Sequence, residues 1–138
     1  MNFLTIEPEI AGAPVGSTPP GHLTCAFDTW LGDDLVRAFP VLLATTPLKT
    51  ALLKLRGRSG FEVQRARVRA SPFFRKHNPG KRLPPFFAIT VSGKAGRDDF
   101  GLTAAGVLVV SRRILDVLLG FRIGRALVGQ YIEDGSRS

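Results

Sequence analysis

The chain has 138 residues, with 19 basic and 11 acidic side chains, so its formal net charge is +8 at pH 7. This length suits one domain, and a hydrophobic fraction of 44% with ten phenylalanines is sufficient for a true core. A single cysteine excludes an internal disulfide, and no apolar run approaches the ~18 residues that a membrane span needs. The amino end lacks the basic start and apolar run of a signal peptide, so we expect a cytoplasmic protein. Its positive charge should attract polyanions or acidic protein faces.

The first third of the chain is predicted to hold an arm, a strand and a short helix. Residues 1–21 are rich in Pro and Gly and are typical of an extended arm. Residues 22–27 alternate in the manner of a strand. Over 28–39, Asp33 and Asp34 suit the first turn of a helix, because the helix macrodipole favours anions there. The apolar spacing after them predicts one buried helix face, and a proline then ends the helix.

Two similar strand–helix units come later in the chain. In the first, a buried strand over 41–44 leads to Thr46, which suits an N-cap because a proline follows it at the first helical position. In the second, a buried strand over 107–110 leads to Ser111, whose hydroxyl can accept an orphan amide of the next helix. Apolar residues at helical spacing follow both caps. The two units therefore predict two amphipathic helices.

Each helix leads into a further strand pattern, at 61–70 after the first and at 122–128 after the second, and another strand is predicted at 86–91. We therefore predict an α+β domain over residues 22–132. It would have one mixed or antiparallel sheet with two or three short helices packed on it, built from two strand–helix–strand units. Residues 133–138 are polar and are predicted to be a disordered tail.

The clearest functional signal is the segment 54–82, which holds ten Lys and Arg against one acid, a net charge of +9, while the rest of the chain sums to −1. Within it, Arg65, Arg67 and Arg69 recur at the two-residue period of a strand, so one face should carry all three guanidinium groups. A surface that docks an anionic partner and a merely solvated strand face are both consistent with this pattern. The candidate contact residues are the only tryptophan and seven basic residues: Trp30, Arg65, Arg67, Arg69, Arg75, Lys76, Lys81 and Arg82.

Nucleic acid is one natural partner for such a segment. Phe73 and Phe74, next to Arg75, offer aromatic rings on which bases stack. However, the sequence contains no zinc-binding pattern, RNA-recognition octamer or GXXG loop, and adjacent phenylalanines more often form core and rim. A nucleic-acid-binding module is therefore our second hypothesis.

Two pairs of acidic residues are the candidates for metal or acid–base chemistry. Asp33 and Asp34 form one pair, and Asp98 and Asp99 form the other. A hard-cation site collects several oxygen ligands, and nothing in the sequence places the two pairs together. Capping, loop hydrogen bonds or pairing with arginines is the interpretation we favour.

A cysteine–histidine nucleophile is the other catalytic possibility. It would need Cys25 to meet His22 or His77 in space together with an orienting group. We favour a buried structural cysteine instead. No phosphate-binding loop, dinucleotide-binding loop or HExxH motif is found, so we predict that the protein is not an enzyme and that it has no catalytic residues, cofactor or metal.

The order of short motifs over residues 25–121 resembles a family of small bacterial immunity-type proteins, which are found beside polymorphic or contact-dependent toxins. The motifs that carry the resemblance are WLGDDLVRAFP (30–40), LATTPLKTAL (43–52), GFEV (60–63), LPPFF (83–87), DDFG (98–101) and LVVS (108–111).

The resemblance implies an α+β module that blocks a cognate toxin by binding it, with no chemistry of its own. The family pattern is more acidic around residues 62–69, where this chain carries three arginines. This departure argues against a typical basic nuclease as the target. It favours a toxin with an acidic or mixed surface.

Overall fold

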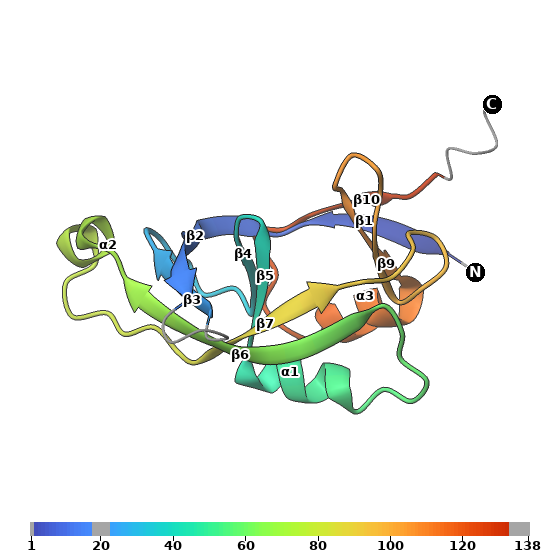
Figure 1. Cartoon of the computed structure of the whole chain (residues 1–138), viewed down its shortest axis with the longest axis horizontal. Helices are drawn as coiled ribbons and strands as arrows, with labels where there is room; N and C mark the ends of the chain where they lie inside the picture. The colour runs from blue at the N-terminus through green and yellow to red at the C-terminus, as the bar shows by residue number, and fades with distance from the viewer. Residues whose placement is uncertain (1, 18–22, 133–138) are drawn as a thin grey trace.

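The computed structural model describes residues 2–17 and 23–132, which form a closed six-stranded barrel, a separate four-stranded sheet and three short helices (Figure 1). The strands are β1 (Phe3–Glu7), β2 (Glu9–Ser17), β3 (Leu23–Phe27), β4 (Leu35–Ala38), β5 (Val41–Thr45), β6 (Phe61–Ala70), β7 (Phe86–Val91), β8 (Phe100–Leu102), β9 (Leu108–Ser111) and β10 (Leu127–Gln130). The helices are α1 (Thr46–Leu53), α2 (Pro72–His77) and α3 (Arg112–Leu118).

The barrel has the strand order β2-β3-β6-β7-β5-β4 and closes between β4 and β2. The β2–β4 and β3–β6 pairs are parallel, whereas the other pairs are antiparallel. Its interior is filled by one cluster of buried side chains, among them Cys25, Phe27, Leu43, Phe74 and Phe86. Burial of these large side chains removes apolar surface from water and provides most of the barrel's stabilisation.

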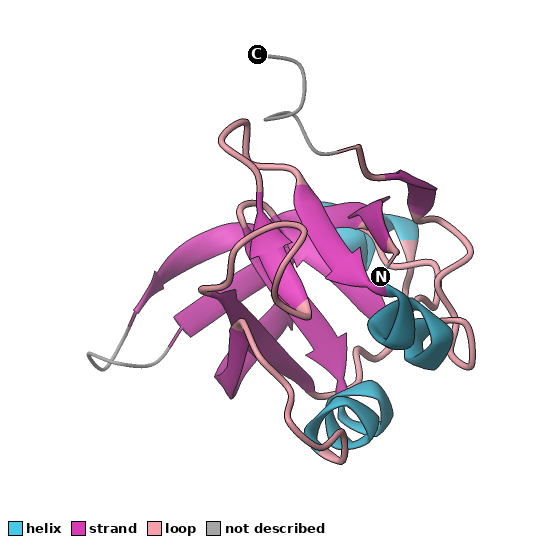
Figure 2. Ribbon diagram, turned by 90° about the vertical axis from the view of Figure 1, so that its right-hand side faces the viewer, coloured by secondary structure: helices cyan, strands magenta, loops and turns pink. Residues whose placement is uncertain are grey.

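The second sheet has the order β10-β1-β9-β8, and all its pairs are antiparallel. A second apolar cluster joins this sheet to the outside of the barrel. Both α1 and α3 contribute to this cluster and contact each other. In Figure 2 the strands make up the body of the molecule and the helices lie at its periphery. The helix residues of the cluster are Leu48, Leu52, Ile114, Leu115 and Leu118.

The predicted single sheet with helices packed on it is wrong, because the two strand–helix units belong to different sheets. The unit β5–α1–β6 lies in the barrel, where β7 separates β5 from β6. The unit β9–α3–β10 lies in the four-stranded sheet, where β1 separates β9 from β10. The fold is mostly β, and the similarity of the two units reflects local strand–cap–helix chemistry rather than one shared sheet.

The predicted helix over 28–39 is also wrong, because its apolar part is strand β4. Leu35 and Val36 are both fully buried, but they point to opposite sides of β4 and belong to different core clusters. A short strand that is buried on both faces has adjacent apolar residues, which resemble one stripe of a helix. The structure also places strands β1 and β2 in the described part of the segment 1–21, for which an arm was predicted.

Of the two caps predicted above, Ser111 is confirmed and Thr46 is wrong. The Ser71 hydroxyl accepts the N–H of Phe74 at 3.1 Å, and the Ser111 hydroxyl accepts the N–H of Ile114 at 3.4 Å. At the start of α1 the cap position is Thr45 rather than Thr46, and its side chain makes no cap hydrogen bond. None of the helices in the described residues has the length and apolar character that a membrane crossing requires. The tail predicted at 133–138 lies outside the described residues.

Candidate partner-binding surface

The two faces of β6 differ sharply in what they contact. Ala66 and Val68 point toward the barrel interior and pack against its apolar cluster. The opposite face begins with the buried Phe61 and continues into three exposed residues, Arg65, Arg67 and Arg69. The strand alternation thus places the three arginines in one outward row, as the sequence predicted. We call these three residues the arginine row.

Within residues 2–17 and 23–132, the arginine row has no acidic partner. The ion pairs found among the described residues involve Arg112, Arg113 and Arg125, none of which belongs to the row. Lys49 adds another positive charge close by, since its Nζ lies 4.4 Å from the ring centroid of Phe87, and Phe87 pairs with Arg65 across β6 and β7. The row therefore projects a positive field that the fold itself does not neutralise.

The basic residues after β6 lie on and beyond α2. Arg75 and Lys76 are exposed in the last turn of this helix, and Lys81 and Arg82 are exposed in the loop after it. Of the two adjacent phenylalanines, Phe74 is fully buried in the barrel, and the exposed Phe73 stacks on His77 with ring centroids 4.1 Å apart. This pair is core plus rim, and its exposed ring is already covered on one face by a histidine.

Trp30 is half-buried at the edge of the barrel core. Its indole N–H donates to the backbone oxygen of Asp33 at 2.8 Å, and its ring meets Phe86 edge-on at 6.0 Å. Lys81 donates to the backbone oxygen of Trp30 at 2.6 Å, with its Nζ 5.4 Å from the indole ring. The structure therefore brings Trp30 together with Lys81, through contacts that do not include the arginine row.

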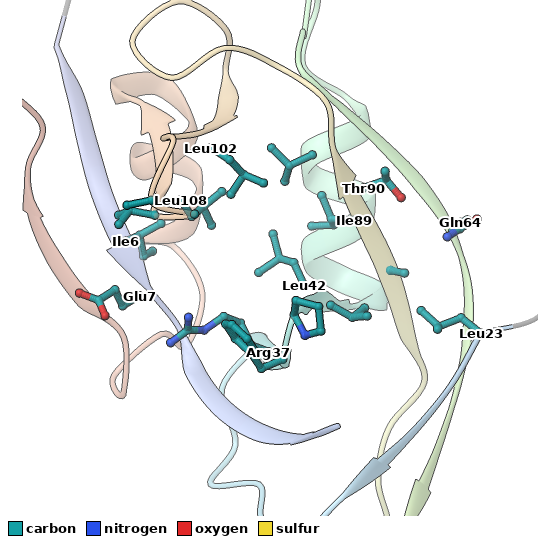
Figure 3. A pocket seen from close by; sticks show the side chains of 18 residues that line it. Ile6, Glu7, Leu23, Arg37, Leu42, Gln64, Ile89, Thr90, Leu102 and Leu108 are labelled. Atoms are coloured by element: carbon teal, nitrogen blue, oxygen red, sulfur yellow. The ribbon is translucent and has the colours of Figure 1, made fainter. Parts of the chain in front are cut away.

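A large pocket that sequence analysis missed opens between the barrel and the four-stranded sheet (Figure 3). Its volume is about 630 Å³ and its lining is mainly apolar, with Leu42 and Ile89 of the barrel facing Leu102 and Leu108 of the sheet. At its rim, Phe39 is 57% exposed and Leu102 is 47% exposed. Pockets of this size and character commonly receive apolar groups of a ligand or partner.

Polar groups lie at the margins of this pocket. The Arg37 Nε donates to the backbone oxygen of Pro8 at 2.9 Å, which fixes the guanidinium at one end near Glu7. Gln64 and Thr90 lie toward the opposite side in Figure 3. The pocket collects residues of β1, the β4–β5 turn, β6, β7 and the β8–β9 loop, so no local sequence pattern marks it.

The pocket and the arginine row adjoin. Leu23 of β3 lines the pocket, and it also lines a smaller hollow of about 260 Å³ together with Arg65, Arg67 and Phe87. Leu23 of β3 thus links the apolar pocket to the hollow that contains Arg65 and Arg67. Interfaces between proteins commonly combine a desolvated apolar centre with arginines and aromatic residues.

The first acidic pair holds loops in place. Asp34 accepts the Thr45 hydroxyl at 2.6 Å and the N–H of Arg122 at 2.8 Å, and Asp33 accepts the N–H of Arg125 at 2.9 Å. These bonds tie the segment before β4 to the chain between α3 and β10, which is the loop-bonding role that the sequence favoured.

The second acidic pair ties α3 to the loops around β8. Asp98 accepts the N–H of Lys94 at 2.7 Å. The buried Asp99 accepts the Ser111 hydroxyl at 2.7 Å, the N–H of Ser59 at 3.0 Å and two bonds from the Arg113 guanidinium. Burial alone would raise the pKa of Asp99, but the hydrogen bonds from Arg113, Ser111 and Ser59 outweigh it and hold that pKa below its ordinary value.

The structure does not bring Cys25 and His77 together. Cys25 is buried in the apolar barrel core, which raises the pKa of its thiol, and His77 is exposed on α2. His22 lies outside the described residues. Within residues 2–17 and 23–132, no group of three or more His, Cys, Asp and Glu side chains is arranged to hold a metal ion.

Glu9 is a partly buried acid that sequence analysis did not single out. Its Oε1 is buried without a hydrogen-bond partner, and Arg125 lies 3.9 Å from its other oxygen. Burial, and then the nearby charge of Asp33, raise the pKa of Glu9. No sequence pattern marks this contact, because Glu9 and Arg125 are distant in the chain.

Comparisons of the chain with protein-family models, with curated proteins and with solved structures found no significant match.

Proposed function

We propose that this protein is a non-enzymatic, cytoplasmic binding protein, an immunity protein that neutralises a cognate bacterial toxin by direct contact. The motif order that resembles immunity-type proteins supports this proposal. The α+β fold that the resemblance implies is not the fold of this chain, so the proposal draws its main support from the surface rather than from the architecture.

The single observation that carries the proposal is the arginine row, which has no acidic partner in the described part of the chain, near an apolar pocket. Three like charges along one strand repel one another and contribute nothing to folding unless an anion is brought to them. The exposed side chains of Phe39 and Leu102 at the rim of the pocket also leave apolar surface in contact with water, which is unfavourable. A protein partner that covers both features would remove both costs.

The chemistry of the surface specifies the partner. Carboxylates of a toxin can each accept two parallel hydrogen bonds from an arginine of the row. An apolar side chain of the same toxin would enter the pocket of about 630 Å³. The partner is therefore a protein with an acidic or mixed surface and a protruding apolar residue.

Co-expression with neighbouring reading frames tests this proposal. A neighbouring gene product that arrests growth when it is expressed alone should become harmless when this protein is co-expressed with it. The variant Arg65→Glu/Arg67→Glu/Arg69→Glu should lose the rescue and should no longer capture the purified toxin, because its row would then repel the toxin's carboxylates.

A matched control separates contact from net charge. The variant Lys94→Glu/Arg97→Glu/Arg122→Glu changes three exposed basic residues outside the row and lowers the net charge by the same amount. It should keep the rescue. If no neighbouring product is toxic, or if both variants rescue equally, the proposal is wrong. If the protein instead binds DNA or RNA oligonucleotides with an affinity that falls steeply with salt, the nucleic-acid hypothesis replaces it.

A further inference from the structure

The two edges of the four-stranded sheet differ in whether another segment of the chain covers them. At one edge, Leu102 of β8 forms a bridge with Lys94, and the Lys94–Ala95 backbone packs so closely on Gly101 that a Cβ there would collide with it. At the other edge, β10 pairs with β1 on one side, and within the described residues no strand pairs with its second side. One edge is covered and the other is open.

The register shows which backbone groups of β10 are free. The Tyr131 N–H donates to the Phe3 oxygen at 3.2 Å, and Gly129 lies opposite Thr5. Backbone groups alternate in an antiparallel strand between pointing at one neighbour and pointing at the other. Leu127, Gly129 and Tyr131 therefore point at β1, whereas Val128 and Gln130 direct their N–H and C=O groups outward.

Apolar side chains continue past this open edge. Val128 lies opposite the buried Ile6, so it is on the core face of the sheet, yet it is 45% exposed. Beneath it, Leu119 is 60% exposed and lines the same hollow as Val128 and Leu31. The apolar layer under the sheet thus extends to where a further strand would lie, and such a strand would cover it.

The edge also lacks the features that usually prevent strands from pairing between molecules. Natural proteins protect open edges with charged residues, prolines or bulges. The run Ala126-Leu-Val-Gly-Gln-Tyr-Ile132 contains no charge and no proline, and its pairing with β1 shows no register shift. Arg125, just before the strand, lies near Glu9 rather than free at the edge.

The strand is complementary to itself. In an antiparallel pair centred on Gly129, the outward groups of Val128 meet those of Gln130 in a second copy, and each pair exchanges both of its hydrogen bonds. Leu127 then lies opposite Tyr131 of the second copy, an apolar–aromatic pair of the kind that stabilises sheets. Gly129 faces Gly129, so no side chains crowd the centre.

The charge of the molecule permits this pairing. The β10 run is neutral, and in Figure 1 α2 and the carboxyl end of β6 lie in the opposite half of the molecule. Salt screens charges over about 8 Å at physiological ionic strength, so the two basic segments would repel each other weakly. We propose that β10 pairs antiparallel with β10 of a second copy, making one continuous sheet across a two-fold axis. This proposal does not depend on the proposed function.

Sedimentation or light scattering of the full chain over a range of concentrations tests the pairing. The expected mass is twice the 14.9 kDa of one chain, falling toward that of one chain on dilution. Val128→Lys places a charge on the new interface, and Gln130→Pro removes an N–H that points outward and leaves the bonds to β1 intact. Each should raise the dimer dissociation constant at least about tenfold, while the circular dichroism spectrum stays that of the folded chain.

Leu102→Lys is the matched control, because it changes an exposed apolar residue at the covered edge of the same sheet. It should leave the mass of the assembly unchanged. A single-chain mass at every concentration overturns the proposal. So does a dimer that survives both Val128→Lys and Gln130→Pro, since it would then form through another surface.

Discussion

Arg113 and the arginine row on β6 have opposite surroundings. Arg113, in the first turn of α3, donates its Nε and Nη2 to the two oxygens of Asp99 at 3.0 and 2.7 Å, and its Nη1 to the backbone oxygen of Arg56 at 2.8 Å. The arginine row on β6 has no ionic partner among the described residues. The fold thus binds Arg113 on several sides, whereas the part of the chain that the structure describes provides no ion pair to the row.

This difference separates a structural charge from a surface available to a partner. Arg113 and Asp99 join α3, the start of β8 and the loop before β6, and the apolar cluster around them packs the same segments together. An arginine that serves folding is normally satisfied in this way. Arginines that remain unsatisfied on a rigid strand are candidates for contacts outside the molecule.

The largest effect is expected from Asp99→Ala. This change removes the carboxylate, which accepts hydrogen bonds from the Ser111 hydroxyl, the Ser59 N–H and the Arg113 guanidinium. Asp99 is buried but Arg113 is exposed, so the cost comes mainly from the hydrogen-bond donors that lose their acceptor. We expect the free energy of unfolding to fall by about 2 to 3 kcal/mol. Urea unfolding followed by circular dichroism measures it.

The control for this change is Asp116→Ala, which breaks the exposed pair with Arg112. Surface pairs of this kind are worth less than about 1 kcal/mol. If the two alanine variants lose the same stability, the Asp99 junction is not the structural tie that we describe.

Much of the local structure around both sets of arginines is predictable from sequence. The alternation of Arg65, Arg67 and Arg69 with small apolar residues gives β6 and its exposed face, because a strand exposes every second residue. Ser71 and Ser111 mark helix starts, because their hydroxyls accept the orphan amides of the first turn. Each of these signals lies within a few residues of chain.

The errors lie where distant segments decide the structure. In β2, Gly12 reads as a loop residue, but it stands where β2 passes so close to Ala26 that a Cβ would collide with the Ala26 oxygen. Pro14 also reads as a breaker, but the register of β2 shifts just after it, and an irregular position in a strand tolerates proline. The close approach at Gly12 and the register shift after Pro14 both depend on how β2 pairs in the closed barrel, so the local sequence does not predict them.

The same limit applies to the candidate site. The arginine row is local and was predicted, whereas the apolar pocket is assembled from β1, β4, β5, β6, β7 and the β8–β9 loop. Phe39 shows how this happens, because its spacing after Leu35 and Val36 predicts a buried helix position. In the structure it lies exposed at the rim of the pocket, beyond the end of β4.

A smaller effect is expected in the acid dependence of stability. Because the folded-state pKa of Asp99 lies below its ordinary value, its stabilising contribution is fully present above the unfolded-state pKa of about 3.9. It is lost as the pH falls through the folded-state pKa. Asp99→Asn cannot ionise, so the gap in stability between the parent protein and this variant should be constant near neutral pH and should narrow below about pH 4. Urea midpoints across this range measure it, and a gap that widens on acidification would contradict the role of Asp99.

The smallest effect is expected from single Arg→Gln changes in the arginine row. Neighbouring arginines two positions apart on a strand are about 7 Å apart at the backbone, and at that distance two charges in water repel by about 0.6 kcal/mol. Salt screens this repulsion, so each glutamine should change the free energy of unfolding by less than about 0.5 kcal/mol, toward greater stability. Arg113→Gln, the matched change at the bound arginine, should instead destabilise the chain.

Salt sharpens this last contrast. Added salt shortens the screening length, so it should stabilise the parent protein by weakening repulsion within the row. The triple variant Arg65→Gln/Arg67→Gln/Arg69→Gln should show a smaller stabilisation by salt, measured as the shift of the urea midpoint between low and high salt. If single Arg→Gln changes in the row cost as much stability as Arg113→Gln, the arginines of the row stabilise the fold. They would then have partners within the folded chain and would not be available to a second protein.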